Sequence, residues 1–117
     1  GRRRTAGMAR LLMARFDIYS NPGKNRKSVP FLVDIQSNVI SGLATRVVVP
    51  LRPLATFASL SLPGDLFPLI AIDGVDHFLD MPQMGAIPST ELKNKVGSAQ
   101  AHQFAIQSAL DRVFGAY

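Results

Sequence analysis

Short runs of alternating apolar and polar residues open the folded part of this chain, and turn-forming residues end each run. Residues 15–19 (RFDIY) alternate in this way, and residues 30–37 (PFLVDIQS) do so again with Phe31, Val33 and Ile35 on one face. A period of two residues is typical of a β-strand with one buried face. A basic, turn-rich segment separates the two runs. The pattern predicts two half-buried strands separated by a loop.

The next run is apolar throughout and does not alternate. Residues 46–49 (RVVV) are β-branched and apolar on both faces, which predicts a strand at the centre of a sheet. Pro50 is expected to stop that strand, because proline has no backbone N–H to donate. Prolines then punctuate residues 51–64, which we interpret as a connection with about one helical turn.

A hairpin is predicted further along the chain. Two apolar runs, residues 66–72 and 75–81, flank the pair Asp73-Gly74. Glycine takes positive φ without steric cost, so an Asp-Gly pair between apolar runs is a strong signal for a two-residue turn.

The C-terminal segment carries a helical pattern. Gly97 and Ser98 supply a candidate N-cap, and Gly115 stands where a C-terminal glycine would end the helix. Apolar residues recur between them at helical spacing: Ile106, Ala109, Leu110 and Val113. The expected fold class is therefore mostly β, a small antiparallel sheet or barrel capped by one C-terminal α-helix.

Charge is unevenly distributed along the 117 residues. Residues 1–27 hold eight of the 13 cations and one of the eight acids, whereas residues 28–117 hold five cations and seven acids, a balance of −2. The net charge of +5 thus belongs to one end of the chain. A basic face on the folded body is not expected, which argues against direct nucleic-acid binding.

Composition limits the class of protein further. No apolar run approaches the roughly 18 residues that a membrane span needs, and the absence of cysteine fits a cytoplasmic location. Residues 1–12 are rich in arginine and have no acid, so we interpret them as a leader or tag remnant that is poorly ordered. Residues 13–117 are expected to form one domain.

No constellation of catalytic residues stands out. Asp73, Asp76, His77 and Asp80 straddle the predicted hairpin, where alternation sends His77 to the face opposite Asp76 and Asp80, so a metal site is not expected. His102 has no acid or nucleophile three or four residues further along the chain, and a general base needs a substrate and an orienting partner. We therefore expect a protein that is not an enzyme, uses no cofactor and acts by binding another protein.

Four segments together carry a family resemblance. Residues 31–38 (FLVDIQSN), 46–51 (RVVVPL), 66–69 (LFPL) and 84–88 (MGAIP) are similar to the motifs F-V-D-V-Q-S-D, R-x-V-I-P-L, L-Y-P-V and M-x-S-V-P. These motifs belong to the CcdB family of toxins from toxin–antitoxin pairs. Spacings agree within a residue or two from Met13 to Phe114.

The resemblance implies an SH3-like barrel with a C-terminal helix, and a homodimer with two terminal helices side by side. It also implies a toxin that binds the A subunit of DNA gyrase, traps gyrase on cleaved DNA, and is neutralised by a CcdA-like antitoxin with a disordered tail. The gyrase-binding residues it implies are Asp111, Phe114, Gly115, Ala116 and Tyr117.

We expect the antitoxin to be acidic, because the loop after the first strand is the strongly basic feature of the domain. The antitoxin-binding residues predicted on this basis are Lys24, Arg26, Lys27 and Arg52.

The chain departs from the family at its C-terminus. Well-known members end in F-W-G-I, whereas this chain ends in Phe114-Gly115-Ala116-Tyr117 and contains no tryptophan. Two alternatives therefore stay open. One is a CcdB-like domain that binds antitoxin but no longer poisons gyrase, and the other is a MazF-type endoribonuclease toxin. The second needs a basic RNA groove, which the negative balance of residues 28–117 disfavours.

Overall fold

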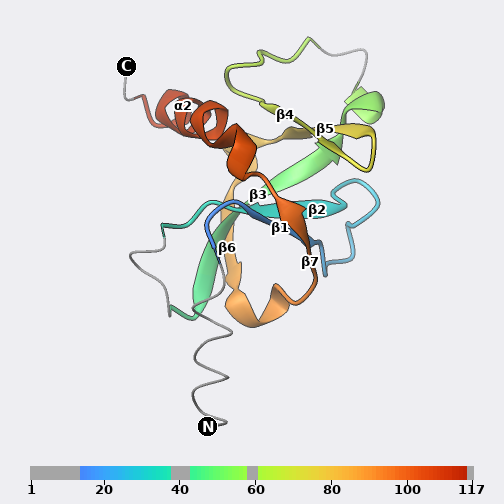
Figure 1. Ribbon diagram of the computed structural model, residues 1–117, viewed down its shortest axis with the longest axis vertical. Coiled ribbons are helices and arrows are strands. Elements are labelled where there is room, and N and C mark those ends of the chain that lie inside the picture. The colour runs from blue at the N-terminus through green and yellow to red at the C-terminus, as the bar shows by residue number, and fades with distance from the viewer. Residues whose placement is uncertain (1–13, 38–42, 58–60, 116–117) are drawn as a thin grey trace, which may run out of the picture.

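The computed structural model describes residues 14–37, 43–57 and 61–115. One sheet and one C-terminal α-helix make up most of the fold (Figure 1). The strands are β1 (Asp17–Ser20), β2 (Phe31–Asp34), β3 (Thr45–Pro53), β4 (Leu69–Ile72), β5 (Val75–Leu79), β6 (Gly85–Pro88) and β7 (Lys95–Ser98). The helix is α2 (Gln103–Val113), and 3-10 turns occur at η2 (Leu54–Phe57), η3 (Met81–Gln83), η4 (Ser89–Glu91) and η5 (Gln100–His102).

The seven strands form one antiparallel sheet in the order β4-β5-β3-β2-β1-β7, with β6 also paired to β3. The long strand β3 is the centre of this arrangement. Its first half pairs with β6, its second half pairs with β5, and β2 lies along its other edge. The sheet curls into a half-barrel, which confirms the fold class expected from the sequence.

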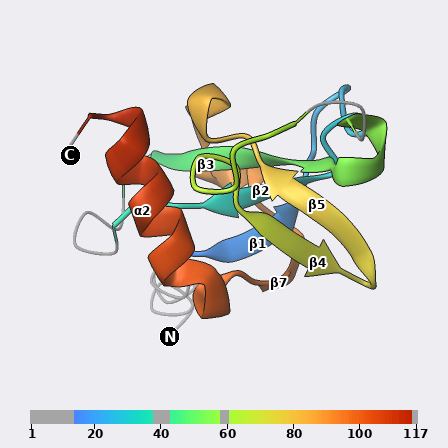
Figure 2. The ribbon, with the colours of Figure 1, turned by 90° about the horizontal axis from the view of Figure 1, so that it is seen from above.

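The main core lies between the curled sheet and α2, whose axis crosses the ends of the strands (Figure 2). Helix residues Ile106, Ala109 and Leu110 are buried against sheet residues such as Val33 and Leu51. The predicted apolar spacing of the helix is confirmed, because these positions face the sheet. Among the described residues, no helix is long and apolar enough to cross a membrane.

A smaller core lies on the other face of the sheet. It is formed by Tyr19, Val29, Leu32, Val48 and Leu92. Residues on both faces of β3 are therefore covered, as the apolar run of this strand predicts.

The predicted hairpin is also confirmed. Ile72 pairs with Val75 across the turn. Asp73 has φ 51° and Gly74 has φ 76°, which are the left-handed conformations that a two-residue turn of type I′ requires.

Two local predictions are wrong. Strand β3 does not stop at Pro50 but continues to Pro53. Pro50 still accepts a hydrogen bond on its carbonyl from the Asp80 N–H at 2.9 Å. Gly97 and Ser98 do not cap α2, because they form the end of β7. The Ser98 Oγ instead accepts a hydrogen bond at 3.1 Å from the N–H of Gln100, in the 3-10 turn that precedes the helix.

Candidate functional site

The C-terminal end of α2 presents an aromatic side chain to solvent. The Gly115 N–H donates to the Arg112 carbonyl at 3.3 Å, and Gly115 has φ 67°. This conformation favours glycine and ends the helix, as the sequence predicts. The Phe114 side chain just before it is 71% exposed. Ala116 and Tyr117 lie outside the described residues.

Polar contacts fix the position of this helix end. The Gln107 side chain accepts a hydrogen bond from Arg15 at 3.0 Å and donates one to Asp111 at 3.2 Å. Arg112 forms an ion pair with Asp65 at 3.1 Å. The predicted site residue Asp111 is therefore already hydrogen-bonded, whereas the apolar ring of Phe114 is exposed to solvent.

The loop between β1 and β2 presents the predicted basic residues. Lys24, Arg26 and Lys27 are all exposed, and within the described part of the chain none of the three forms an ion pair. Three like charges on one short loop create a positive surface that attracts acidic partners.

Asn21 gives this loop a defined shape. Its Nδ2 donates to the Val29 carbonyl at 2.7 Å and to Asn25 Oδ1 at 2.9 Å. Its Oδ1 accepts from the Gly23 N–H at 2.9 Å. The cations are thus carried on a bonded loop, which reduces the entropy that a partner must remove on binding.

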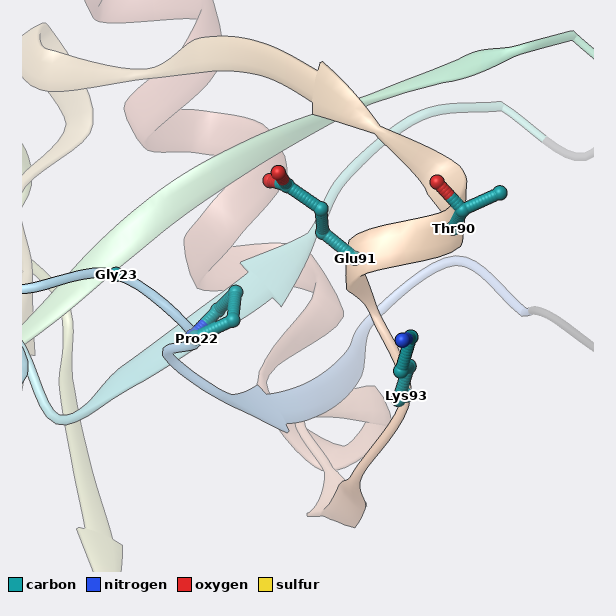
Figure 3. Close-up of a pocket in the computed structure, with 5 residues that line it drawn as sticks. All are labelled: Pro22, Gly23, Thr90, Glu91 and Lys93. Carbon is teal, nitrogen blue, oxygen red and sulfur yellow. The ribbon is translucent and has the colours of Figure 1, made fainter.

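An open pocket of about 290 Å³ lies beside the basic loop (Figure 3). Pro22 and Gly23 line it from the loop, and Thr90, Glu91 and Lys93 line it from the segment between β6 and β7. The lining combines apolar, anionic and cationic groups.

Arg52 differs from the three exposed cations because it is half-buried and forms an ion pair. It follows Leu51, which pairs with Phe31 at the end of the basic loop. Its Nε lies 2.8 Å from Asp80 Oδ2, and its side chain is 23% exposed. Arg52 is therefore next to the strand that leaves the loop, but its charge is largely compensated by Asp80.

A buried ion pair explains why two of the resemblance motifs occur together. The Asp34 carboxylate, which is fully buried, accepts hydrogen bonds from Arg46 Nε at 2.8 Å and Nη2 at 3.0 Å. Gln36 completes the group, because its N–H donates to Asp34 and its Oε1 accepts from the Val47 N–H. Burial raises the pKa of Asp34, although Arg46 opposes the shift. The three residues join β2 to β3 and are closed to substrates.

A family model, described as CcdB protein, matches residues 15–115. The chain belongs to the CcdB family. A search among curated proteins found no match.

Two more segments that carried the CcdB resemblance have structural roles. Phe67, from the segment LFPL, packs edge-on against Phe78 with ring centroids 6.0 Å apart. The segment MGAIP runs through β6, and Met84 packs against the main core. The CcdB motifs thus specify the sheet, while both surfaces predicted to bind partners lie outside them.

Two of the residues considered for catalysis, His77 and Asp80, are held in structural contacts. His77 is buried, with its Nδ1 2.8 Å from the Val75 carbonyl. Asp80 pairs with Arg52, and His102 precedes α2 in a 3-10 turn. Within the described residues, no group of three or more such side chains could hold a metal ion.

Two features of the surface and core were not predicted from the sequence. Phe104 is 80% exposed on α2, and an apolar residue on the polar side of the helical pattern was the available signal. The buried contact of the Tyr19 hydroxyl with Asp17, at 3.5 Å, was also missed. Alternation places both residues on one face of β1, but it does not reveal that the face is covered.

Proposed function

We propose that this chain is the toxin of a type II toxin–antitoxin pair that binds the A subunit of DNA gyrase and traps gyrase on cleaved DNA. The observation that carries the proposal is the CcdB family match over residues 15–115. It is supported by the exposed aromatic ring of Phe114 at the end of α2, where the family resemblance assigns the gyrase contact.

Binding at this surface does not need the tryptophan found in well-known members. Interface energy concentrates in a few side chains, and aromatic residues are prominent among them. Phe114 is already exposed and is held by a helix end that Arg112 and Asp65 fix in place. It therefore serves as the aromatic group that enters the target. The protein acts as a homodimer and not as an enzyme.

The antitoxin binds at the basic loop and the adjoining pocket. Lys24, Arg26 and Lys27 supply positive charge, and the pocket beside them receives side chains of an acidic, extended segment. This places antitoxin binding on different elements from the gyrase-binding end of α2. Arg52 contributes from the neighbouring strand if its ion pair with Asp80 opens.

The test is induction of the protein in bacteria, followed by measurement of DNA cleavage complexes, RNA fragments and growth. Gyrase cleavage complexes are expected to accumulate. Fragmented RNA without cleavage complexes would favour the endoribonuclease alternative. Neither product, together with retained antitoxin binding, would indicate a domain that no longer poisons gyrase.

A truncated variant locates the activity. Deleting residues 115–117 should abolish growth inhibition and leave the fold, the dimer and antitoxin binding intact, because these residues follow the last residue of α2. The matched control is Val75→Ser, which changes a half-exposed apolar residue beside the hairpin turn. A truncated protein as toxic as the full chain would show that residues 115–117 are not needed for gyrase binding, and Phe114→Ser would then test the remaining contact at the end of α2.

A further inference from the structure

The described strands leave the half-barrel open, and a pocket lies in the opening. Strands β4 and β7 stand at the two ends of the strand order. Within the described residues β4 pairs only with β5, and β7 pairs only with β1. A pocket of about 250 Å³ is lined by residues of both edge strands, together with Asp73 from the hairpin turn and His102 from η5. Two sheet edges therefore border one pocket.

The edge of β4 presents backbone groups to this pocket. Ile72 and Val75 flank the two-residue turn and form a hydrogen-bonded pair. Such pairs alternate along an antiparallel ladder, so the N–H and C=O of Ala71 point away from β5. Ala71 is one of the residues that line the pocket. The sequence of β4, LIAI, contains no charge and no proline that would protect this edge from another strand.

The edge of β7 presents the same kind of groups from the other side. The Ala99 N–H donates to the Phe16 carbonyl at 2.7 Å. The adjacent pair in the register is Asp17 with Ser98, so the N–H and C=O of Ser98 point away from β1. Ser98 also lines the pocket. A single extended segment in the opening can therefore hydrogen-bond to both edges, as in β-strand addition.

The floor of the pocket is apolar and leaves space at one position. Ile18 and Ile70 line the pocket and are each 4% exposed. Gly97 of β7 has no side chain, and a Cβ placed there would have one described atom within 4 Å, the Ile18 Cδ1 at 3.9 Å. This is an ordinary van der Waals distance. An apolar side chain of a bound segment thus has room above Gly97.

Charge at the pocket favours a basic segment. Asp73 is exposed and His102 is half-buried, and neither side chain forms a hydrogen bond or an ion pair with another described residue. Asp76, on the neighbouring strand β5, is also exposed. Lys95, the cation of β7, is already paired with Asp17 at 3.1 Å. The uncompensated charge beside the opening is therefore negative and attracts a cationic group.

We propose that the opening between β4 and β7 binds an extended segment of a partner protein, rich in branched apolar residues and carrying a lysine or arginine. The segment adds one strand to the half-barrel and pairs with the backbone of Ala71 on one side and Ser98 on the other. Its apolar side chain lies above Gly97, and its cation lies beside Asp73. The charge is opposite to that of the acidic segment expected at the basic loop, so this inference does not depend on the proposed function.

The experiment uses a short capped peptide of alternating valine and threonine with a lysine at each end, so that either strand direction brings one lysine to Asp73. The comparison peptide has glutamate at both ends. Each is titrated into the nitrogen-15-labelled full-length protein, and nuclear magnetic resonance follows the amide signals. The lysine peptide should shift the signals of Ala71 and Ser98 and slow the hydrogen exchange of both amides.

Three variants locate the bound peptide. Gly97→Val fills the floor of the pocket, and it should keep the stability of β7 because glycine weakens a strand and valine favours one. Asp73→Asn removes the charge and keeps a residue that suits the same turn. The matched control is Asp76→Asn, which removes a nearby exposed carboxylate outside the pocket lining. Urea unfolding verifies that each variant is folded.

We expect Gly97→Val to weaken binding of the lysine peptide by about tenfold or more. Asp73→Asn should weaken it by about threefold and remove the preference over the glutamate peptide. Asp76→Asn should have a smaller effect than Asp73→Asn. Absence of binding at millimolar peptide, equal binding by a folded Gly97→Val variant, or equal affinity of the wild type for both peptides would each overturn the inference.

Discussion

The fold changes the pKa of one buried side chain, Tyr19. Its ring belongs to the smaller core, and its hydroxyl lies 3.5 Å from the Asp17 carboxylate. Burial and then the negative charge of Asp17 raise the pKa of Tyr19 to about 12. Asp17 keeps its own charge balanced through Lys95 at 3.1 Å. The phenol therefore stays protonated at alkaline pH.

This pKa predicts a measurable loss of stability at high pH. An ordinary tyrosine ionises near pH 10. Between that pH and the folded value of about 12, the unfolded chain releases a proton that the native state keeps. The free energy of unfolding should then fall by about 1.4 kcal/mol per pH unit from this group. Urea titrations from pH 9 to 12 should show that the free energy of unfolding falls less steeply with pH in Tyr19→Phe than in wild type.

The same pKa can be measured directly. The chain has two tyrosines and no tryptophan, so a Tyr117→Phe variant leaves Tyr19 as the single source of phenolate absorbance. Its ultraviolet titration should have a midpoint about two pH units above that of a free tyrosine. A midpoint near pH 10 in the folded protein would contradict the buried contact with Asp17.

The Asp34–Arg46 pair leads to a second prediction at this scale. Arg46→Met leaves the fully buried Asp34 carboxylate without its charged partner, and breaking a buried pair in this way costs about 3–5 kcal/mol. The exposed pair supplies a control, because Arg112→Met should cost at most about 1 kcal/mol. Urea unfolding at pH 7 checks both values.

Acid should partly rescue the Arg46→Met variant. Without Arg46 the desolvation that raises the pKa of Asp34 is unopposed by the guanidinium. A folded pKa above the unfolded one means that the native state takes up the proton first, so stability rises as pH falls through that range. A destabilisation equal at pH 5 and pH 7 would show that Asp34 does not titrate in this environment.

Among the elements, strands and helix faces were predictable and several element ends were not. Alternation placed Phe31, Val33 and Ile35 on one side of β2, and that side packs against the main core. The end of β3 was not predictable from Pro50. Proline has no N–H, so only its carbonyl needs a hydrogen-bond partner, and the strand continues where that partner is present. That partner, the N–H of Asp80, is 30 residues away in the sequence.

The start of α2 was unpredictable for a similar reason. Ser98 is a good capping residue, but pairing of Asp17 with Ser98 keeps it in β7. The parts of the predicted antitoxin-binding surface also differ in how well the sequence locates them. Charge along the chain was enough to locate the basic loop, whereas the pocket beside it needs Glu91 and Lys93 from a distant segment. Local patterns predict local structure, and contacts between distant segments decide the rest.

The loop between β1 and β2 carries the prediction at the scale of an element. Changing Lys24, Arg26 and Lys27 to Glu should slow antitoxin association and flatten its dependence on salt, because these exposed cations steer an acidic partner. Stopped-flow kinetics at several salt concentrations measure this. The same three positions changed to Gln should have an intermediate effect. An unchanged association rate for the Glu variant would remove the loop from the antitoxin interface.

Several large apolar side chains lie on the described surface of the molecule. The whole chain has a mean hydropathy of +0.16, and the described residues leave large apolar side chains exposed on separate elements. These are Leu43, Leu69, Val75, Val96, Phe104 and Phe114. The sequence pattern alone did not reveal where these exposed side chains lie.

Self-association is the prediction for the molecule as a whole. Dimers of identical chains are the commonest symmetric assemblies, and family membership together with this apolar surface leads us to expect one here. Sedimentation equilibrium at micromolar concentration should give about twice the chain mass of 12.7 kDa. A single species near the chain mass would refute the dimer, and gyrase binding would then have to be explained by one copy of α2.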